Sequence, residues 1–277
     1  ALLERVTAEL RAAGTLVILD VKRGDIGTTM TAYGEAFLGK DAPEPADAIT
    51  VSPYLGYESL RPALDLARDT GRGVFVLALT SNPEGAGVQH AVTPGGTVAG
   101  DIVAAAARDN ADAAARGEWG HIGFVMGATI GSALDDLGLG GALAASNAPI
   151  LAPGLGAQGG TVESMRSVFG ESISRVIPTT SRDVLKAGPS VDGLVAALIA
   201  DRDLEARHEE RRLAGATGQV VQGEVGPLDE DLRIGPVAHA GAGHAARGLA
   251  DHAQLAGAVQ LLVGDRAARQ GRAGPGD

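Results

Sequence analysis

The most informative stretch of the chain reads Leu16-Val-Ile-Leu-Asp20-Val-Lys22-Arg-Gly-Asp25-Ile26. Its leading apolar residues suit a short strand that is buried on both faces, as in a parallel sheet. Because residues i and i+2 of a strand point to the same side, Asp20 and Lys22 are expected to project together from the strand's carboxyl end. Gly24 then breaks the strand, and Asp25 follows where the chain turns away.

Two carboxylates and an ammonium at the end of a buried strand are energetically costly unless they are paired. Such a group is a candidate for proton transfer or charge stabilisation, which makes Lys22, Asp20 and Asp25 candidate catalytic residues. The plainer alternative for a D-x-K pattern is a salt bridge at a strand end. The remaining motifs of the chain help to decide between the two interpretations.

Composition narrows the class of protein. The chain has 277 residues, which suffices for one large domain or a domain with an appendage, and its net charge of −11 argues against a general nucleic-acid binder. It contains no cysteine, so disulfides and thiolate metal sites are excluded. We also expect no membrane span, because no apolar run approaches the roughly 20 residues that one needs. The first residues are typical of the middle of a helix and not of a signal peptide, so we expect a cytoplasmic protein.

Strand and helix patterns alternate along the first 206 residues, and polar or glycine-rich residues gather after each strand. The predicted strands are 15–22, 48–52, 73–80, 121–126, 149–152 and 175–178. The predicted helices are 2–13, 28–37, 58–69, 98–116, 131–137, 161–168, 183–187 and 191–206. This alternation is typical of a parallel α/β fold.

A TIM (β/α)8 barrel fits this pattern best, because polar residues follow nearly every strand. About six of the eight βα units are present, so we expect an incomplete barrel over residues 1–206, with the two missing units upstream. Residues 207–277 are expected to be a tail of uncertain order, although 255–263 could form a short helix. The tail carries four of the histidines: His208, His239, His244 and His252. Their spacing matches no familiar metal site, so we predict no bound metal.

The loop Pro153-Gly-Leu-Gly-Ala-Gln-Gly-Gly160 is a second strong motif. Its glycines would let backbone N–H groups approach an anion, and Gln158 adds a side-chain donor. This loop and the one that carries Arg182 follow the last two predicted strands, where barrel enzymes commonly bind phosphate. The alternative is a flexible turn, with Arg182 as a surface charge. Ser81 and Asn82, after the third strand, could bind a ligand or form a turn.

These motifs resemble the orotidine 5′-phosphate decarboxylase family. Asp20-Val-Lys22-Arg-Gly-Asp25-Ile26 is similar to its D-x-K-x-x-D-I signature, and the resemblance covers roughly residues 1–206. It is closest to the branch of the family that is found in mycobacteria and other actinobacteria. Further matching segments follow in order: Ser52-Pro-Tyr-Leu-Gly56, Thr80-Ser-Asn-Pro-Glu-Gly85, Gly127-Ala-Thr129 and Pro153 to Gly160.

The resemblance implies a carbon–carbon lyase that decarboxylates orotidine 5′-phosphate to UMP, the last step of pyrimidine synthesis, without a cofactor. Lys22 would stabilise and protonate the C6 carbanion, and Asp20 would lie against the substrate carboxylate. The family is homodimeric with shared active sites, to which each subunit lends Asp25, Ile26 and Thr29. The resemblance also assigns ligands for the base and the phosphate: Ser81 and Pro153 at the pyrimidine, Gln158 and Arg182 at the phosphate.

The chain also departs from the family pattern. A further lysine and an aspartate that bind ribose in the family belong to strands that would precede residue 1, so we expect weak or no turnover by this chain. Two alternatives therefore stay open. One is a Mg²⁺-dependent sugar-phosphate decarboxylase or aldolase, since relatives of that kind share D-x-K-x-x-D. The other is an inactive remnant that only binds nucleotide phosphate.

Overall fold

The computed structural model of the chain describes residues 2–43, 45–198, 200 and 259–261. Contacts within the chain divide it into two units, Ala1–Arg182 with Gln254–Asp277, and Asp183–Ala253. The predicted boundary at residues 206 and 207 lies outside the described residues, as do the four tail histidines. In the second unit, buried Val184 and Leu194 pack together, and residues 191–198 are helical as predicted.

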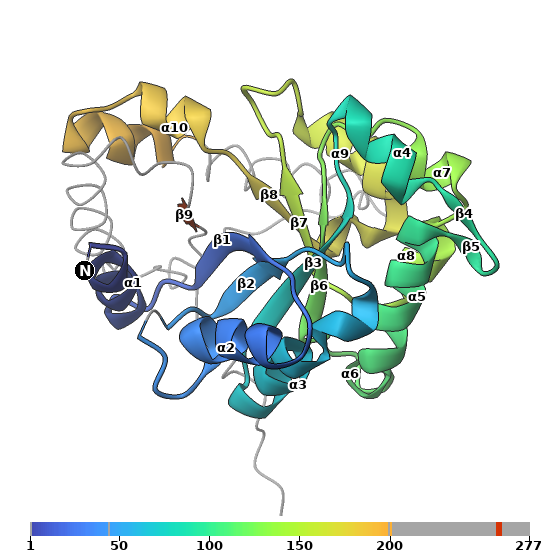
Figure 1. The fold of residues 1–277 in the computed structure, drawn as a ribbon. Coiled ribbons are helices and arrows are strands. Elements are labelled where there is room, and N and C mark those ends of the chain that lie inside the picture. Colours follow the sequence, from blue (N-terminus) through green and yellow to red (C-terminus); the bar gives the residue numbers. More distant parts are fainter. Residues whose placement is uncertain (1, 44, 199, 201–258, 262–277) are drawn as a thin grey trace, which may run out of the picture. The chain divides into compact units, whose positions relative to one another are not determined.

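The first unit is built on a curled, mostly parallel sheet with helices packed against it (Figure 1). Six parallel strands are ordered β8-β7-β6-β3-β2-β1 across the sheet, which confirms the predicted incomplete barrel. Their bounds are β1 Val17–Arg23, β2 Ala48–Val51, β3 Gly73–Leu79, β6 Ile122–Met126, β7 Ile150–Pro153 and β8 Val176–Thr179. A seventh strand, β9 (Val259–Leu261), pairs antiparallel with β1. The helix predicted over 255–263 is therefore wrong at these three residues.

The helices agree with the prediction except between β3 and β7. They are α1 Leu2–Ala12, α2 Gly27–Leu38, α3 Arg61–Thr70, α5 Val98–Asp109, α6 Ala111–Ala115, α7 Ala133–Asp136, α8 Gly140–Ala145, α9 Val162–Phe169 and α10 Arg182–Lys186. Short 3-10 turns precede α3 and follow α9: η1 Tyr57–Leu60 and η3 Gly170–Arg175. Among the described residues, no helix is both long and apolar enough to cross a membrane.

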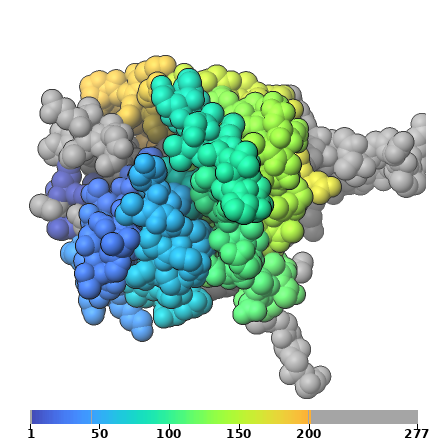
Figure 2. Space-filling view, turned by 45° about the vertical axis from the view of Figure 1, so that its right-hand side comes forward, coloured from blue at the N-terminus to red at the C-terminus, as the bar shows by residue number. Residues whose placement is uncertain are grey.

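The segment between β3 and α5 contains structure that the sequence patterns did not predict. It comprises η2 Pro83–Gly85, α4 Ala86–Gln89 and the hairpin strands β4 Val92–Thr93 and β5 Gly96–Thr97. The segment lies at the surface, where it is drawn turquoise in Figure 2, and the Val92 side chain is 89% exposed.

The predicted helix 98–116 breaks at Asn110, whose buried side chain bonds to the start of β6. Its Nδ2 donates to the carbonyls of Ile122 (2.8 Å) and Ser146 (3.3 Å), and its Oδ1 accepts from the Ile122 N–H (3.2 Å). A Cβ at Gly120 would overlap the Asn110 amide, so only glycine fits there. Asn110 therefore ties the end of α5 to the amino end of β6.

One layer of the core is a row of side chains, one from each of five neighbouring strands. All four residues of β2 and all five of β6 are buried, as expected for strands covered on both faces. The row on one face is Ile18, Ala48, Phe75, Val125 and Leu151. Close packing of this kind holds the carboxyl ends of the strands in fixed relative positions.

Two arginines donate to backbone carbonyls at the carboxyl ends of helices. Arg72 donates to the carbonyls of Phe37 (3.1 Å) and Gly39 (2.8 Å) at the end of α2. Arg175 donates to the carbonyls of Leu143 and Ala144 in α8, both at 3.0 Å. Burial lowers the pKa of both arginines. Helix carbonyls carry partial negative charge, which favours a cation at this end.

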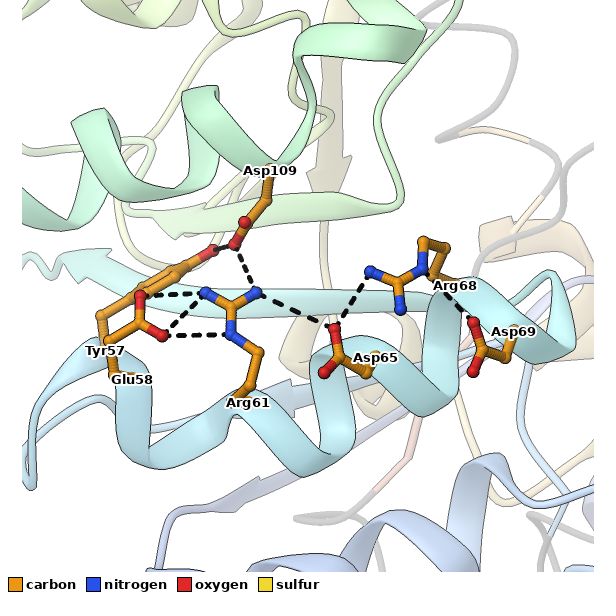
Figure 3. Close-up of polar contacts among 7 residues, drawn as sticks. All are labelled: Tyr57, Glu58, Arg61, Asp65, Arg68, Asp69 and Asp109. Atoms are coloured by element: carbon orange, nitrogen blue, oxygen red, sulfur yellow. Dashed lines mark hydrogen bonds and ion pairs between the residues drawn. The ribbon is translucent and has the colours of Figure 1, made fainter.

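A polar cluster links η1 and α3 to the end of α5 (Figure 3). The Asp109 carboxylate accepts from the Tyr57 hydroxyl (2.7 Å) and from Arg61 Nη1 (2.9 Å), and Arg61 also forms a bidentate pair with Glu58. Burial, followed by the bond to Asp109, raises the pKa of Tyr57. The bonds to Glu58 and Asp109 raise the pKa of Arg61 against its desolvation.

Candidate active site

The carboxyl ends of the six parallel strands lie along one edge of the sheet, because neighbouring strands run in the same direction. In barrels of this class, catalytic residues gather at that edge. The structure places every predicted site residue there or in the loop or first helical turn that follows: Asp20, Lys22, Asp25, Ile26 and Thr29 in and after β1, Ser81 after β3, Pro153 and Gln158 in and after β7, and Arg182 after β8.

The end of β1 is not the regular strand that the alternation argument assumed. Leu19 pairs with Ile49 and Arg23 pairs with Val51, so three residues of β1 lie opposite Thr50 alone. This is a β-bulge, which re-aims side chains next to active sites. Lys22 has a φ of 44°, in the left-handed region that non-glycine residues rarely adopt. The bulge, and not simple i and i+2 spacing, therefore places the Lys22 side chain.

Lys22 and Asp20 form an ion pair, with the Lys22 ammonium donating to Asp20 Oδ2. The Lys22 side chain is 51% exposed and that of Asp20 is 14% exposed, so the ammonium is open to a ligand while the carboxylate lies deeper. Thr50 completes the group: its hydroxyl donates to Asp20 Oδ1 (2.8 Å) and accepts from the Lys22 N–H (2.9 Å). Sequence reasoning missed Thr50, although a hydroxyl inside the apolar run Ala48–Val51 was a usable signal.

Asp25 is held by its own loop. Its Oδ1 accepts from the Ile26 N–H at 2.8 Å, and among the described residues no ion pair joins it to Lys22 within 4.0 Å. Gly24 lies so close to β2 that a Cβ would overlap the Ser52 carbonyl oxygen. Ile26 is 62% exposed, and Thr29 is exposed in the first turn of α2. Asp25, Ile26 and Thr29 thus present to solvent a surface next to the Lys22–Asp20 pair.

A hydrogen-bonded turn carries Ser81. Gln89 Oε1 accepts from the Thr80 N–H (2.9 Å) and Gln89 Nε2 donates to the Thr80 hydroxyl (2.7 Å), which in turn donates to Asn82 Oδ1 (2.6 Å). Asn82 Nδ2 donates to Glu84 (3.0 Å). Of the two interpretations left open for Asn82, the structure therefore shows that of a turn residue. Ser81 itself is exposed between these bonded neighbours.

The glycines of the Pro153–Gly160 loop do not offer their N–H groups to a ligand, contrary to the prediction. The N–H groups of Gly156, Gly159 and Gly160 donate to carbonyls of the loop itself, and that of Gly154 donates to the Thr179 carbonyl of β8 at 3.4 Å. The glycines are needed for backbone shape, since Gly154, Gly156 and Gly159 have φ of 122°, 73° and 86°. Gln158 is exposed in this loop, so its side chain stays the predicted phosphate ligand.

Arg182 begins α10 three residues after the end of β8 and is exposed. β7 and β8 are neighbours that pair in parallel from Ile150↔Val176 to Pro153↔Thr179, so the loops that bear Gln158 and Arg182 leave the sheet side by side. The described residues contain no group of three or more His, Cys, Asp or Glu side chains that could hold a metal ion.

Comparison with known proteins agrees with this geometry. A family model described as "Orotidine 5′-phosphate decarboxylase / HUMPS family" matches residues 3–193. An orotidine 5′-phosphate decarboxylase of Streptomyces coelicolor is 53% identical over 206 residues, which are 73% of this chain and 69% of the relative. One of Nocardioides sp. is 54% identical over 190 residues, which are 67% of this chain and 66% of the relative.

A crystal structure from Streptomyces avermitilis, provisionally assigned as an orotidine 5′-phosphate decarboxylase, superimposes with a TM-score of 0.66 at 52% identity. The superposition covers 73% of this chain and 68% of that one. The match of the family model over most of the chain, together with relatives more than half identical, is decisive. The chain belongs to the orotidine 5′-phosphate decarboxylase / HUMPS family.

Proposed function

We propose that this protein decarboxylates orotidine 5′-phosphate to UMP in pyrimidine synthesis. The observation that carries the proposal is the Lys22–Asp20 ion pair at the carboxyl edge of the sheet, in a chain whose relatives are named for this reaction. A homodimer that acts in the cytoplasm, without a cofactor, is part of the same proposal.

Lys22 is suited to the chemical step because its ammonium is both exposed and oriented by Asp20. When the bond from C6 to the carboxylate breaks, CO₂ leaves and the electron pair stays on C6. An ammonium held close to C6 stabilises that charge electrostatically and then transfers one proton to the carbon. Asp20 faces the departing carboxylate with a like charge, which disfavours the bound ground state more than the transition state. Lys22 regains its proton from solvent.

Groups distant from C6 would supply binding energy. Gln158 and Arg182 are assigned to the 5′-phosphate, where a guanidinium can bind two phosphate oxygens at once. Ser81 and Pro153 are assigned to the pyrimidine. Binding energy at a remote phosphate can support strain and ordering at the reacting base.

The proposed dimer would share its active sites, with Asp25, Ile26 and Thr29 of each copy reaching the Lys22 of the other. Support comes from the surface beside Lys22, where three large apolar side chains are exposed after β1 and β2. Ile26 is 62% exposed, Tyr54 78% and Leu55 53%. Exposed apolar patches of this kind often mark protein–protein contacts.

The test is release of CO₂ and formation of UMP from orotidine 5′-phosphate by the purified protein, with and without EDTA. We expect EDTA-insensitive turnover. Turnover that EDTA abolishes would favour the Mg²⁺-dependent relatives instead. UMP binding by calorimetry, with no turnover at all, would identify a protein that only binds nucleotides. Weak turnover, which the sequence leads us to expect, stays a prediction, and the same assay measures it.

A further inference from the structure

We propose that Thr50 is a positioning residue for this reaction. Its single hydroxyl group fixes the position of Lys22 relative to Asp20. The proposal rests on the proposed function, because it names a residue that serves the same site. Thr50 is 0% exposed, so it acts through Asp20 and Lys22 and not on the substrate.

The β-bulge creates the need for such a residue. With Asp20, Val21 and Lys22 all opposite Thr50, the regular ladder between β1 and β2 is interrupted. A buried backbone N–H without a partner costs about 1–3 kcal/mol. The Lys22 N–H is partly buried and avoids part of this cost by donating to the Thr50 hydroxyl at 2.9 Å instead of to a backbone carbonyl. The same bond supports the unusual φ of 44° at Lys22.

The direction of the hydrogen bonds is fixed by chemistry. The Lys22 N–H can only donate, so the Thr50 oxygen accepts there, and its one proton is free for Asp20 Oδ1 at 2.8 Å. Asp20 Oδ2 meanwhile accepts from the Lys22 ammonium. Both carboxylate oxygens thus have a partner, and the plane of the carboxylate is set from two sides. Thr50 thereby links the backbone of Lys22 to the anion that orients its side chain.

The partners of the Thr50 hydroxyl point to a role beyond packing. Thr50 is 0% exposed in a strand whose other three residues are apolar and buried, and valine has nearly the same shape as threonine. A valine would fill the same space but would leave the Lys22 N–H and Asp20 Oδ1 without this partner, so the hydroxyl serves these two polar groups and not the apolar packing. The partners of the hydroxyl are the two residues of the proposed reaction centre, and this location gives it a role in catalysis.

The test compares Thr50→Val, which removes the hydroxyl, with Thr50→Ser, which keeps it. We expect kcat of Thr50→Val to fall by about 10–100-fold, the size of effect that follows misplacement of a catalytic group, with KM changed less than about threefold. Thr50→Ser should recover most of kcat. Amide hydrogen exchange at Lys22 should be fast in Thr50→Val and slow in the wild type and in Thr50→Ser.

Each outcome has a definite meaning. An unchanged kcat and a protected Lys22 amide in Thr50→Val would overturn the proposal, as would a loss that Thr50→Ser fails to rescue. If the wild type forms no UMP while the Lys22 amide of Thr50→Val exchanges fast, the proposed function fails and the positioning of Lys22 by Thr50 stands.

Discussion

Lys22 is a charged residue in a backbone conformation that L-residues rarely adopt, with a φ of 44°. The left-handed region costs a non-glycine residue about 1–2 kcal/mol. Such strain persists only where the surroundings over-determine it, and it is concentrated at functional sites. Here the bulge in β1 and the bond from the Lys22 N–H to Thr50 supply that constraint.

Comparing Lys22→Gly with Lys22→Ala isolates this backbone strain. Both variants lose the ammonium and its ion pair with Asp20, but only alanine keeps a Cβ at positive φ. We expect the glycine variant to be more stable by about 0.5–1 kcal/mol in urea unfolding. In an ordinary strand, glycine would be the less stable of the two by a similar amount. An alanine variant at least as stable as the glycine variant would therefore contradict a strained Lys22.

At the scale of single elements, the six parallel strands could be predicted to within two residues at each end. Their apolar runs end in glycine, proline, polar or charged residues, so local sequence is enough to find them. The placement of Lys22 and Asp20 at a strand end followed from the same reasoning.

Other elements depend on contacts between distant residues, which local patterns do not reveal. The bulge needs Thr50 of β2 opposite β1, and the turn at Ser81 needs Gln89 nine residues after Thr80. The break of the predicted helix 98–116 comes from bonds between Asn110 and Ile122. The role of the glycines in the Pro153–Gly160 loop was misjudged because a run of glycines does not say which carbonyls its N–H groups will meet.

The cluster that joins η1 and α3 to α5 yields a prediction about stability. Arg61 bonds to Asp109 across elements and its side chain is 31% exposed, whereas Arg68 is 56% exposed and pairs with Asp65 and Asp69 of its own helix. Arg61→Ala should lower the free energy of unfolding by about 1–2 kcal/mol, because it leaves the partly buried Asp109 with fewer donors. The control Arg68→Ala should change it by less than about 0.5 kcal/mol. Equal losses in urea unfolding would show that the cluster does not link these elements.

His121 lies directly before β6, and its burial predicts how the stability of the protein depends on pH. Burial, followed by the nearby Arg68 guanidinium, lowers the pKa of His121 below its ordinary value. The unfolded chain therefore takes up a proton below about pH 6.5, at which the folded imidazole is still neutral. The free energy of unfolding is therefore unaffected by His121 above that pH, and it falls as the pH falls toward the lowered pKa.

Urea unfolding of the wild type and of His121→Gln at pH 7.5 and 5.5 measures this effect. The wild type should lose more of its free energy of unfolding between the two pH values than the variant does. Identical losses would mean that His121 does not contribute.

At the scale of the whole molecule, the proposed sharing of sites between two copies makes a quantitative prediction. Lys22→Ala and Asp25→Ala should each be inactive alone. When the two are mixed and allowed to exchange subunits, half of the dimers should be mixed, and each of these has one site with both Lys22 and Asp25. Activity should recover to about a quarter of the wild-type value. If no activity returns although mixed dimers form, Asp25 does not act in the site of the other copy.

The exchange of subunits is itself measurable, by native mass spectrometry of the mixture. A monomer at micromolar concentration would contradict the proposed dimer. It would also leave the exposed Ile26, Tyr54 and Leu55 side chains without the partner assigned to them.

The central claim is that the Lys22 ammonium, oriented by Asp20, protonates C6 of orotidine 5′-phosphate. The most direct measurement is turnover and UMP binding by Lys22→Ala beside the wild type. We predict that the turnover of the wild type falls to the uncatalysed background in the variant, while UMP binding by calorimetry changes less than about tenfold, because the phosphate ligands are intact. A variant that retains the turnover of the wild type would contradict the account.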